Sequence, residues 1–187
     1  QVGTILVSPV ADPTQGANEV AAQAQARSIP VRSVRVGEVI TAGSVTATVW
    51  WPGRRILDGS VPNNASIVLD AHVAGLDLFL SGDIEREAGH ALWRAVSGDP
   101  ALRSRLSAYD VVKLPHHGSS NLDPSLMGLL RAPLMVVSVG ADNDYGHPSP
   151  GALAWVQSTG ARLLRTDEDG DIAVWLGHGR LTTRTHH

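Results

Sequence analysis

The chain has 187 residues, of which 43 % are hydrophobic and 18 % charged, and this excludes a disordered chain and allows one domain with its own core. The net charge of −3 is weak evidence against a nucleic-acid substrate, because a bound metal can supply positive charge locally. Without cysteine the chain has neither disulfides nor thiolate metal sites, and no apolar run approaches the roughly 18–20 residues that span a bilayer.

Hairpins are expected first along the chain and strand–helix–strand units later. Short apolar or alternating runs predict strands at residues 4–7, 31–36, 45–51, 66–73, 76–80, 109–112, 134–139, 163–164, 172–176 and 181–185. Helical spacing and caps predict helices at residues 18–27, 84–96, 101–106, 124–130 and 149–158. Residues 58–64 should form a loop and residues 167–170 a hairpin turn. This order indicates a single α/β domain over residues 1–187, with two packed sheets flanked by helices; the final residues, 186–187, resemble the stub of a purification tag and are excluded from the site.

Three polar segments each follow an apolar strand. Asp83 follows the run at 76–80, the pair His116 and His117 follows 109–112, and His147 follows 134–139. Strand ends in α/β proteins are where sites are built, so neighbouring strands would bring these loops together. One carboxylate with two or three imidazoles suits zinc or manganese, and a carboxylate can bridge two such ions about 3.5–4 Å apart. Each segment alone has an ordinary explanation as a turn or a surface loop, but the three in this order predict a metal site.

Other polar residues have simpler interpretations. We expect His72 to be a satisfied or solvent-facing strand residue, His90 to lie on a helix surface and His178 to lie in a turn between glycines. Glu85 and Glu87 are read as acids that complement the dipole in the first turn of the helix over 84–96.

Three motifs together carry a family resemblance. They are Leu-Ser-Gly-Asp at 80–83, Lys-Leu-Pro-His-His-Gly-Ser at 113–119 and Tyr-Gly-His-Pro at 145–148, supported by Asn-Asn-Ala-Ser at 63–66 and Arg-Thr-Asp at 165–167. The chain in this respect resembles the metallo-β-lactamase superfamily, and more narrowly the C-terminal hydrolase-like domain of the ComEC family of competence DNA-uptake proteins. The resemblance implies a four-layer αββα sandwich, a binuclear metal centre and phosphodiester hydrolysis, which is a nuclease activity in DNA uptake.

The same resemblance implies roles for individual residues. Asp83 would be the metal-bridging ligand, and one member of the pair His116 and His117 would be a further ligand, with the choice between them left open. His147 would be an additional ligand or a phosphate-contacting group. Asp83 and the histidine pair are therefore the expected catalytic residues, and two divalent ions, zinc or manganese, are the expected cofactors. The expected substrate contacts are Gly118, Ser119, Ser120 and Tyr145, and the two serines are read as hydrogen-bonding groups for a phosphate rather than as nucleophiles.

One departure from the family matters for activity. The signature His-x-His-x-Asp-His, which supplies most ligands of both metals in the superfamily, does not occur in the sequence. The resemblance places it just upstream of a segment like residues 3–9, so the first expectation is an N-terminally truncated domain, and the alternative is a diverged protein that lacks the motif. Such a fragment should fold, hold few or no metal ions and be inactive alone.

For the complete protein the resemblance implies DNA, single-stranded or duplex, as substrate and a membrane channel region of the same polypeptide as partner. The chain would be a soluble domain of a bacterial membrane protein, facing the extracytoplasmic side. Two alternatives remain: a non-catalytic module that binds DNA or a partner, and a stand-alone metallohydrolase for a small phosphoester or ester.

Overall fold

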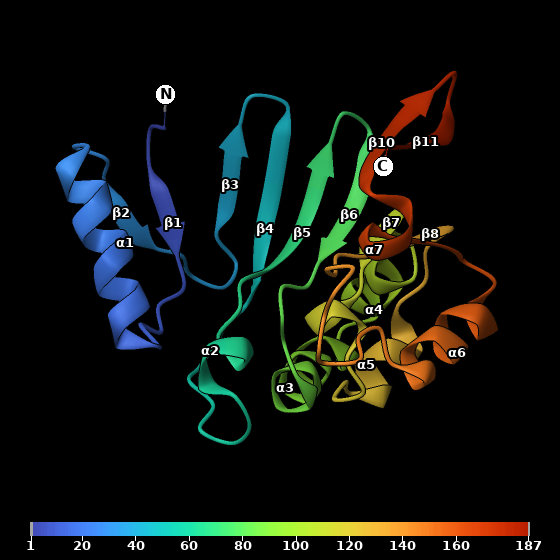
Figure 1. Ribbon diagram of the computed structural model, residues 1–187, viewed down its shortest axis with the longest axis horizontal. Helices are drawn as coiled ribbons and strands as arrows, with labels where there is room; N and C mark the ends of the chain where they lie inside the picture. Colours follow the sequence, from blue (N-terminus) through green and yellow to red (C-terminus); the bar gives the residue numbers. More distant parts are fainter. Residues whose placement is uncertain (1, 187) are drawn as a thin grey trace.

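The computed structural model describes residues 2–186, and its centre is a seven-stranded sheet in the order β3-β4-β5-β6-β7-β8-β9 (Figure 1). The strands are β3 (Val39–Ala42), β4 (Val45–Trp51), β5 (Val68–Val73), β6 (Leu76–Leu80), β7 (Val111–Lys113), β8 (Leu134–Val137) and β9 (Arg162–Arg165). Strands β3 to β6 pair antiparallel and β6 to β9 pair parallel. The predicted α/β class is confirmed. Within this sheet hairpins come first and strand–helix–strand units later, but the chain as a whole begins with a parallel strand–helix–strand unit over residues 5–33 and ends in a hairpin, so the predicted order was wrong at both ends.

Helices cover one face of this sheet. They are α3 (Arg86–Ser97), α4 (Pro100–Leu106), α5 (Pro124–Leu129) and α6 (Pro150–Thr159). Phe79, Val112 and Met135 lie side by side on β6, β7 and β8, and all three are fully buried beneath the helices. Burying a side chain of this size contributes about 1.5–3 kcal/mol, so this row anchors the parallel strands whose ends carry the polar loops.

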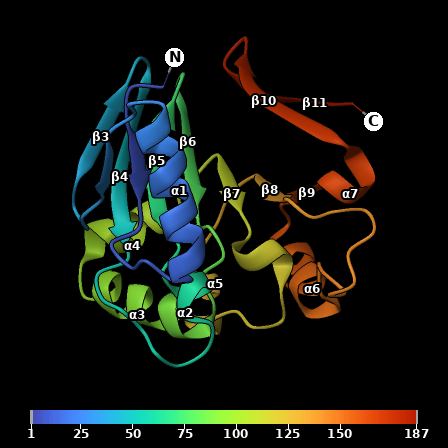
Figure 2. The same ribbon diagram turned by 60° about the vertical axis from the view of Figure 1, so that its left-hand side comes forward.

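Two smaller sheets lie outside the central one. Strands β1 (Ile5–Val7) and β2 (Val31–Ser33) pair parallel and are joined by α1 (Thr14–Ala26), whereas β10 (Asp171–Gly177) and β11 (Arg180–His186) form an antiparallel hairpin. Inward side chains of the hairpin, such as Ile172 and Val174, pack on the face of the central sheet opposite the helices. Figure 2 shows the hairpin extending away from the end of the molecule where α3, α5 and α6 lie.

Several predicted boundaries were wrong. Helix α1 begins at Thr14, ahead of the predicted start at residue 18, and β3 was not predicted. Residues 167–170 do not form a hairpin turn: α7 (Thr166–Asp169) is a short helix, and β10 pairs with β11 instead of β9. A carboxylate oxygen of Asp169 accepts a hydrogen bond from the Arg165 backbone N–H at 2.8 Å, which closes the segment on itself. Helix α2 (Val61–Asn64) likewise replaces a predicted loop, because the Ser60 hydroxyl caps it.

A charged network ties the sheet to α4 at the end away from the polar loops. Arg105 donates to Asp70 at 2.6 Å and to Asp77 at 2.9 Å, and His72 lies 2.9 Å from Asp77. The hydrogen bond from Arg105, together with the one from His72, lowers the pKa of Asp77 from 3.8 to about 2, although burial opposes the shift. His72 is therefore a satisfied, half-exposed strand residue, as predicted.

This network predicts a loss of stability in acid. A carboxyl group whose pKa is lower in the folded than in the unfolded chain stabilises the fold above its unfolded pKa, and this contribution is lost as the pH falls through the folded pKa. Between about pH 4 and about pH 2 the free energy of unfolding should therefore fall by about 1–2 kcal/mol through Asp77, after allowance for solvent screening. Urea unfolding at several pH values, compared with Asp77→Asn, measures this. Equal falls in both proteins would contradict the assignment.

Candidate functional site

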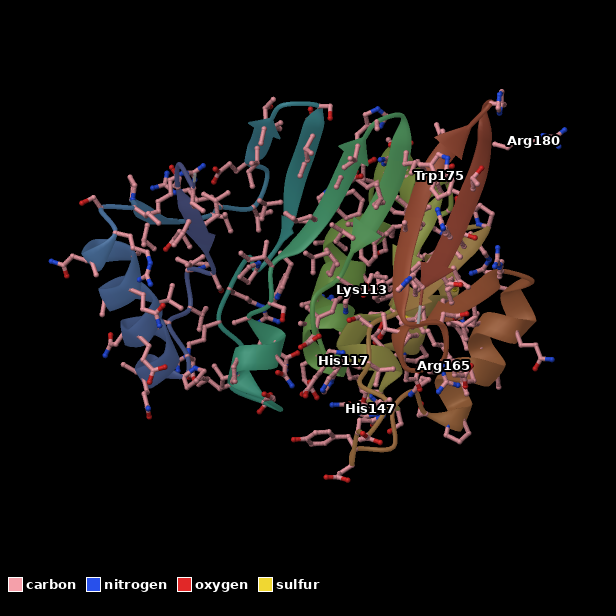
Figure 3. All side chains as sticks on the ribbon, turned by 45° about the horizontal axis from the view of Figure 1, so that its top comes forward. Lys113, His117, His147, Arg165, Trp175 and Arg180 are labelled. Atoms are coloured by element: carbon pink, nitrogen blue, oxygen red, sulfur yellow. The ribbon has the colours of Figure 1, made fainter. Side chains whose placement is uncertain are left out.

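The polar loops meet at one rim of the sheet, where the parallel strands β6, β7 and β8 end. His117 Nε2 lies 3.4 Å from a carboxylate oxygen of Asp83, and the rings of His116 and His147 are 5.5 Å apart between centroids. Figure 3 shows Lys113, His117 and His147 gathered at this rim. The structure thus places all four residues that the sequence singled out as ligands at one rim, as two close pairs whose adjacent rings, His116 and His117, are 6.2 Å apart.

The backbone of the histidine pair is strained. His116 and His117 lie within the 3-10 turn η1 (Pro115–Gly118) with φ of 45° and 54°, and Gly118 follows with φ of 74°. Left-handed conformations of residues other than glycine cost on the order of 1–3 kcal/mol each and are often kept at functional sites. At Gly118 a Cβ would come within 2.8 Å of Pro148, so only glycine fits where the two loops touch. The strain turns two adjacent imidazoles toward one rim.

Asp83 is fixed through both its backbone and its neighbours. Its N–H donates to the Ser66 hydroxyl at 3.0 Å, and its carboxylate is 37 % exposed. Lys113 Nζ lies 3.8 Å from this carboxylate and donates to the carbonyl of Gly82 at 3.1 Å. Burial lowers the pKa of Lys113, and the charge of Asp83 opposes that shift. The only lysine of the chain therefore lies beside the candidate bridging carboxylate, a placement that the sequence interpretation missed.

His116 faces a second acid that was also missed. Glu85 Oε1 lies 3.5 Å from His116 Nδ1, and the side-chain amide of Asn63 donates to Glu85 at 2.9 Å while lying 3.4 Å from His116 Nε2. Glu85 is buried and also accepts from the backbone N–H of Ser60 at 3.0 Å. It precedes α3 and faces the rim, so its interpretation as a first-turn dipole acid was wrong; Glu87 occupies that position.

His147 lies in a loop that Asn143 holds. The Asn143 side chain accepts from the His147 N–H at 3.0 Å and donates to the His147 carbonyl at 2.9 Å. Burial and the nearby His116 and His117 lower the pKa of His147. Its ring stacks on Tyr145 at 6.0 Å, and the tyrosine is 82 % exposed. Together with His117 these residues line an open cleft of about 460 Å³ beside the rim.

The side-chain types at the rim, one carboxylate and three imidazoles, are types that bind zinc or manganese. Nδ1 of His116 and Nδ1 of His147 are buried and make no hydrogen bond, although Glu85 lies 3.5 Å from the former. His117 Nδ1 lies 2.5 Å from the Ser138 carbonyl. Because that oxygen only accepts, Nδ1 carries the proton, while Nε2 of the same ring faces the carboxylate of Asp83. Among residues 2–186, however, no three His, Asp or Glu side chains form a group that could hold an ion. At these distances the described side chains do not make up a complete ligand set.

The two serines predicted to contact a phosphate, Ser119 and Ser120, do not line the cleft beside His117 and His147. Ser119 is buried and its hydroxyl accepts from the backbone N–H of Asn121 at 3.0 Å, within its own loop. Both Ser119 and Ser120 line a different hollow, next to Trp155. Of the predicted substrate contacts, Gly118 and Tyr145 lie in the loops of the rim. A serine that follows a glycine at a turn caps its own loop as readily as it meets a ligand, and sequence alone does not separate the two.

His90 and His178 lie outside the site. His90 is half-exposed on α3, 3.4 Å from the buried carboxylate of Asp123, and His178 has φ of 53° in the turn of the β10–β11 hairpin. Both placements agree with the sequence interpretation.

Comparisons with known proteins give two relatives. The chain is 28 % identical over 150 residues to ComE operon protein 3 of Bacillus subtilis (strain 168), covering 80 % of the chain and 18 % of that protein. It is 30 % identical over 118 residues to competence protein ComA of Neisseria gonorrhoeae, covering 63 % of the chain and 16 % of that protein. The chain thus spans less than a fifth of the length of either relative. No family model matches it. The two similarities support a relationship to competence proteins. Within residues 2–186, no helix has the length and apolar composition needed to cross a membrane.

Proposed function

We propose that the chain is the metallo-β-lactamase-like domain of a DNA-uptake protein of the ComEC type, which cleaves phosphodiester bonds with divalent metal in the complete polypeptide. The observation that carries the proposal is the meeting of Asp83 and His117 with His116 and His147, each of which has a buried Nδ1 that makes no hydrogen bond, at the ends of parallel strands. The relatives, ComE operon protein 3 and competence protein ComA, favour a role in competence and so DNA as the material handled.

The fold proposal extends the observed layers. The seven-stranded sheet with helices on one face would be one half of a four-layer αββα sandwich. The β1–β2 pair with α1 and the β10–β11 hairpin would belong to the second half, since the hairpin already packs on the face of the sheet opposite the helices.

In this proposal the side chains at the rim bind, orient and tune. Asp83, His117, His116 and His147 would hold two zinc or manganese ions, with further ligands from outside these residues. Bound ions of this kind supply Lewis acidity toward a phosphate and activate water. Lys113 balances part of the negative charge of Asp83, and the Ser138 carbonyl fixes the tautomer and the orientation of His117. Glu85 and Asn63 hold the ring of His116. In this proposal the backbone of Gly118 and the ring of Tyr145 would contact a phosphate and its substituent.

The surroundings of this domain follow from the same proposal. The complete polypeptide would carry a membrane channel region, and the domain would act on DNA, single-stranded or duplex, on the extracytoplasmic side. A second candidate is a non-catalytic module that binds DNA beside the channel, favoured by the absence of a three-ligand group among residues 2–186.

The test is cleavage of labelled DNA by the complete polypeptide that the gene encodes, with manganese or zinc and with excess chelator. We expect cleavage with metal and none with chelator, because the two-ion chemistry has no substitute among the side chains at the rim. The present chain, measured in parallel, should cleave poorly and retain little metal after dialysis, because zinc sites use three or four protein ligands. DNA binding without cleavage at any metal concentration would favour the second candidate.

A further inference from the structure

The outer face of the β10–β11 hairpin carries an exposed aromatic ring between two arginines. Residues that pair across antiparallel strands share a face, as do residues two apart along a strand. Trp175 pairs with Thr182, and the neighbouring pairs on this face are Ala173 with Arg184 and Gly177 with Arg180. Arg180 and Arg184 are therefore the diagonal neighbours of Trp175, on opposite sides of it, about 7–8 Å away between Cα atoms.

The indole of Trp175 is open to a ligand. Trp175 is 42 % exposed, which is unusual for so large an apolar side chain on a strand. Its neighbours along β10 on this face are Ala173 and Gly177, which have no bulk to cover it. At Gly177 a Cβ would come within 3.3 Å of the indole nitrogen, so the ring extends over the glycine along the sheet surface. A flat aromatic surface is thus presented to solvent.

The arginines on this face are also uncommitted. Both Arg180 and Arg184 are exposed. The arginine ion pairs among residues 2–186 involve Arg32, Arg55, Arg105 and Arg165. The single acid on this face of the hairpin, Asp171, pairs across the strands with His186, beyond Arg184. The surface around Trp175 is therefore positive, although the chain as a whole is negative.

We propose that this face binds single-stranded DNA, with a base stacked on Trp175 and the adjoining phosphates on Arg180 and Arg184; the choice of DNA rests on the proposed function. Aromatic side chains that stack bases, flanked by cations that follow the backbone, are the general means of holding single strands without reading sequence. A duplex hides its bases from such a ring. An anionic membrane surface could also attract tryptophan and arginine. However, a strand ribbon with one open ring between two charges matches the alternation of base and phosphate, and it has no wide apolar face to insert.

The position of this face suggests what it would do. Figure 3 shows Trp175 on the hairpin and Arg180 extending from its tip, away from the rim that carries His117 and His147. A strand held here would be retained by the domain at a distance from the rim. The hairpin would act as a separate holding site, independent of metal.

The experiment is a fluorescence anisotropy titration of this chain with labelled oligothymidylate, in chelator and at several salt concentrations. Trp175→Ala should weaken binding by about 10- to 100-fold, because base stacking is worth about 1–3 kcal/mol. Trp175→Phe should recover most of the affinity, since it restores a ring. Replacing Arg180 and Arg184 by alanine together should reduce the slope of log affinity against log salt by about 1.4, at about 0.7 per phosphate contact.

Arg27→Ala is the matched control. Arg27 is an exposed arginine at the C-terminal end of α1, far from the hairpin in the sequence, and its one side-chain hydrogen bond goes to a carbonyl of that helix. It should leave both affinity and salt slope unchanged. Wild-type affinity in Trp175→Ala, or no binding by the wild-type chain, would overturn the inference. Dependence on Trp175 for anionic vesicles but not for the oligonucleotide would overturn it in favour of a membrane surface. Because chelator is present throughout, failure of the cleavage test leaves this result intact, and failure here leaves cleavage untouched.

Discussion

Replacing Asp83 with alanine is expected to lower metal-dependent DNA cleavage by the complete polypeptide by at least about 100-fold. The carboxylate is the only one at the rim that faces both His117, at 3.4 Å, and Lys113, at 3.8 Å, among residues 2–186. Without it the proposed pair of ions would lose the group that fixes their spacing. The fold should be unaffected: the carboxylate is 37 % exposed, and pairs of this exposure contribute about 0–1 kcal/mol.

Initial cleavage rates at saturating manganese or zinc measure the expected loss of activity, and urea unfolding of each variant measures the expected retention of the fold. Asp142→Ala is the matched control, since Asp142 is an exposed aspartate in the loop that leads to His147. It should cleave at the wild-type rate. Equal rates for wild type and Asp83→Ala in properly folded proteins would remove Asp83 from the site and with it the proposed two-ion arrangement.

The rim was predictable because it follows from local patterns. Apolar runs mark the strands, and the polar residues after each run must lie at strand ends whatever the order of the sheet, so Asp83 and His147 could be placed from sequence. The other contacts at the rim join residues that are far apart in the sequence, and local patterns do not reveal them. Asn63 meets His116 across 53 residues, and Glu85 meets Asn63 across 22. Rules about helix dipoles act within one turn and therefore assigned Glu85 to the wrong partner.

Two features could have been found with better use of the sequence. A lone lysine directly before the Leu-Pro-His-His segment is unusual in a chain whose other basic residues are arginines, and its position at the end of a buried strand indicates a role at the rim. Trp175 stands between Ala173 and Gly177 in an alternating strand, a pattern that leaves an aromatic ring uncovered. By contrast, the left-handed backbone of His116 and His117 carries no local sequence signal, and its N–H at His116 donates to the carbonyl of Gly82, which lies far away in the sequence.

Asn64→Ala is expected to lower the free energy of unfolding by about 3 kcal/mol. Asn64 is 1 % exposed, and both its side-chain oxygen and its side-chain nitrogen make hydrogen bonds. Its side-chain oxygen Oδ1 accepts from the backbone N–H groups of Glu85 and Ala88, both at 3.2 Å, so it serves as the cap for α3 from outside that helix. Its amide donates to the Asp58 carbonyl and to the Glu87 carboxylate, both at 3.1 Å. Alanine would leave these buried donors and acceptors without partners, and an unsatisfied buried group costs about 1–3 kcal/mol.

Urea unfolding of both proteins at neutral pH measures the change, and Asn63→Ala is the control from the same short helix. Asn63 contacts Glu85 and His116 through its side chain but caps no helix, so its loss should cost about 1 kcal/mol. Asn64→Asp keeps the acceptor for the α3 N–H groups but sets a charge against Glu87, so it should recover only part of the loss. A change below about 1 kcal/mol in Asn64→Ala would show that α3 is held by its buried face alone. If the cost is near 3 kcal/mol, the start of α3, and with it Glu85 beside His116, depends on Asn64, which lies 21 positions before Glu85 in the chain.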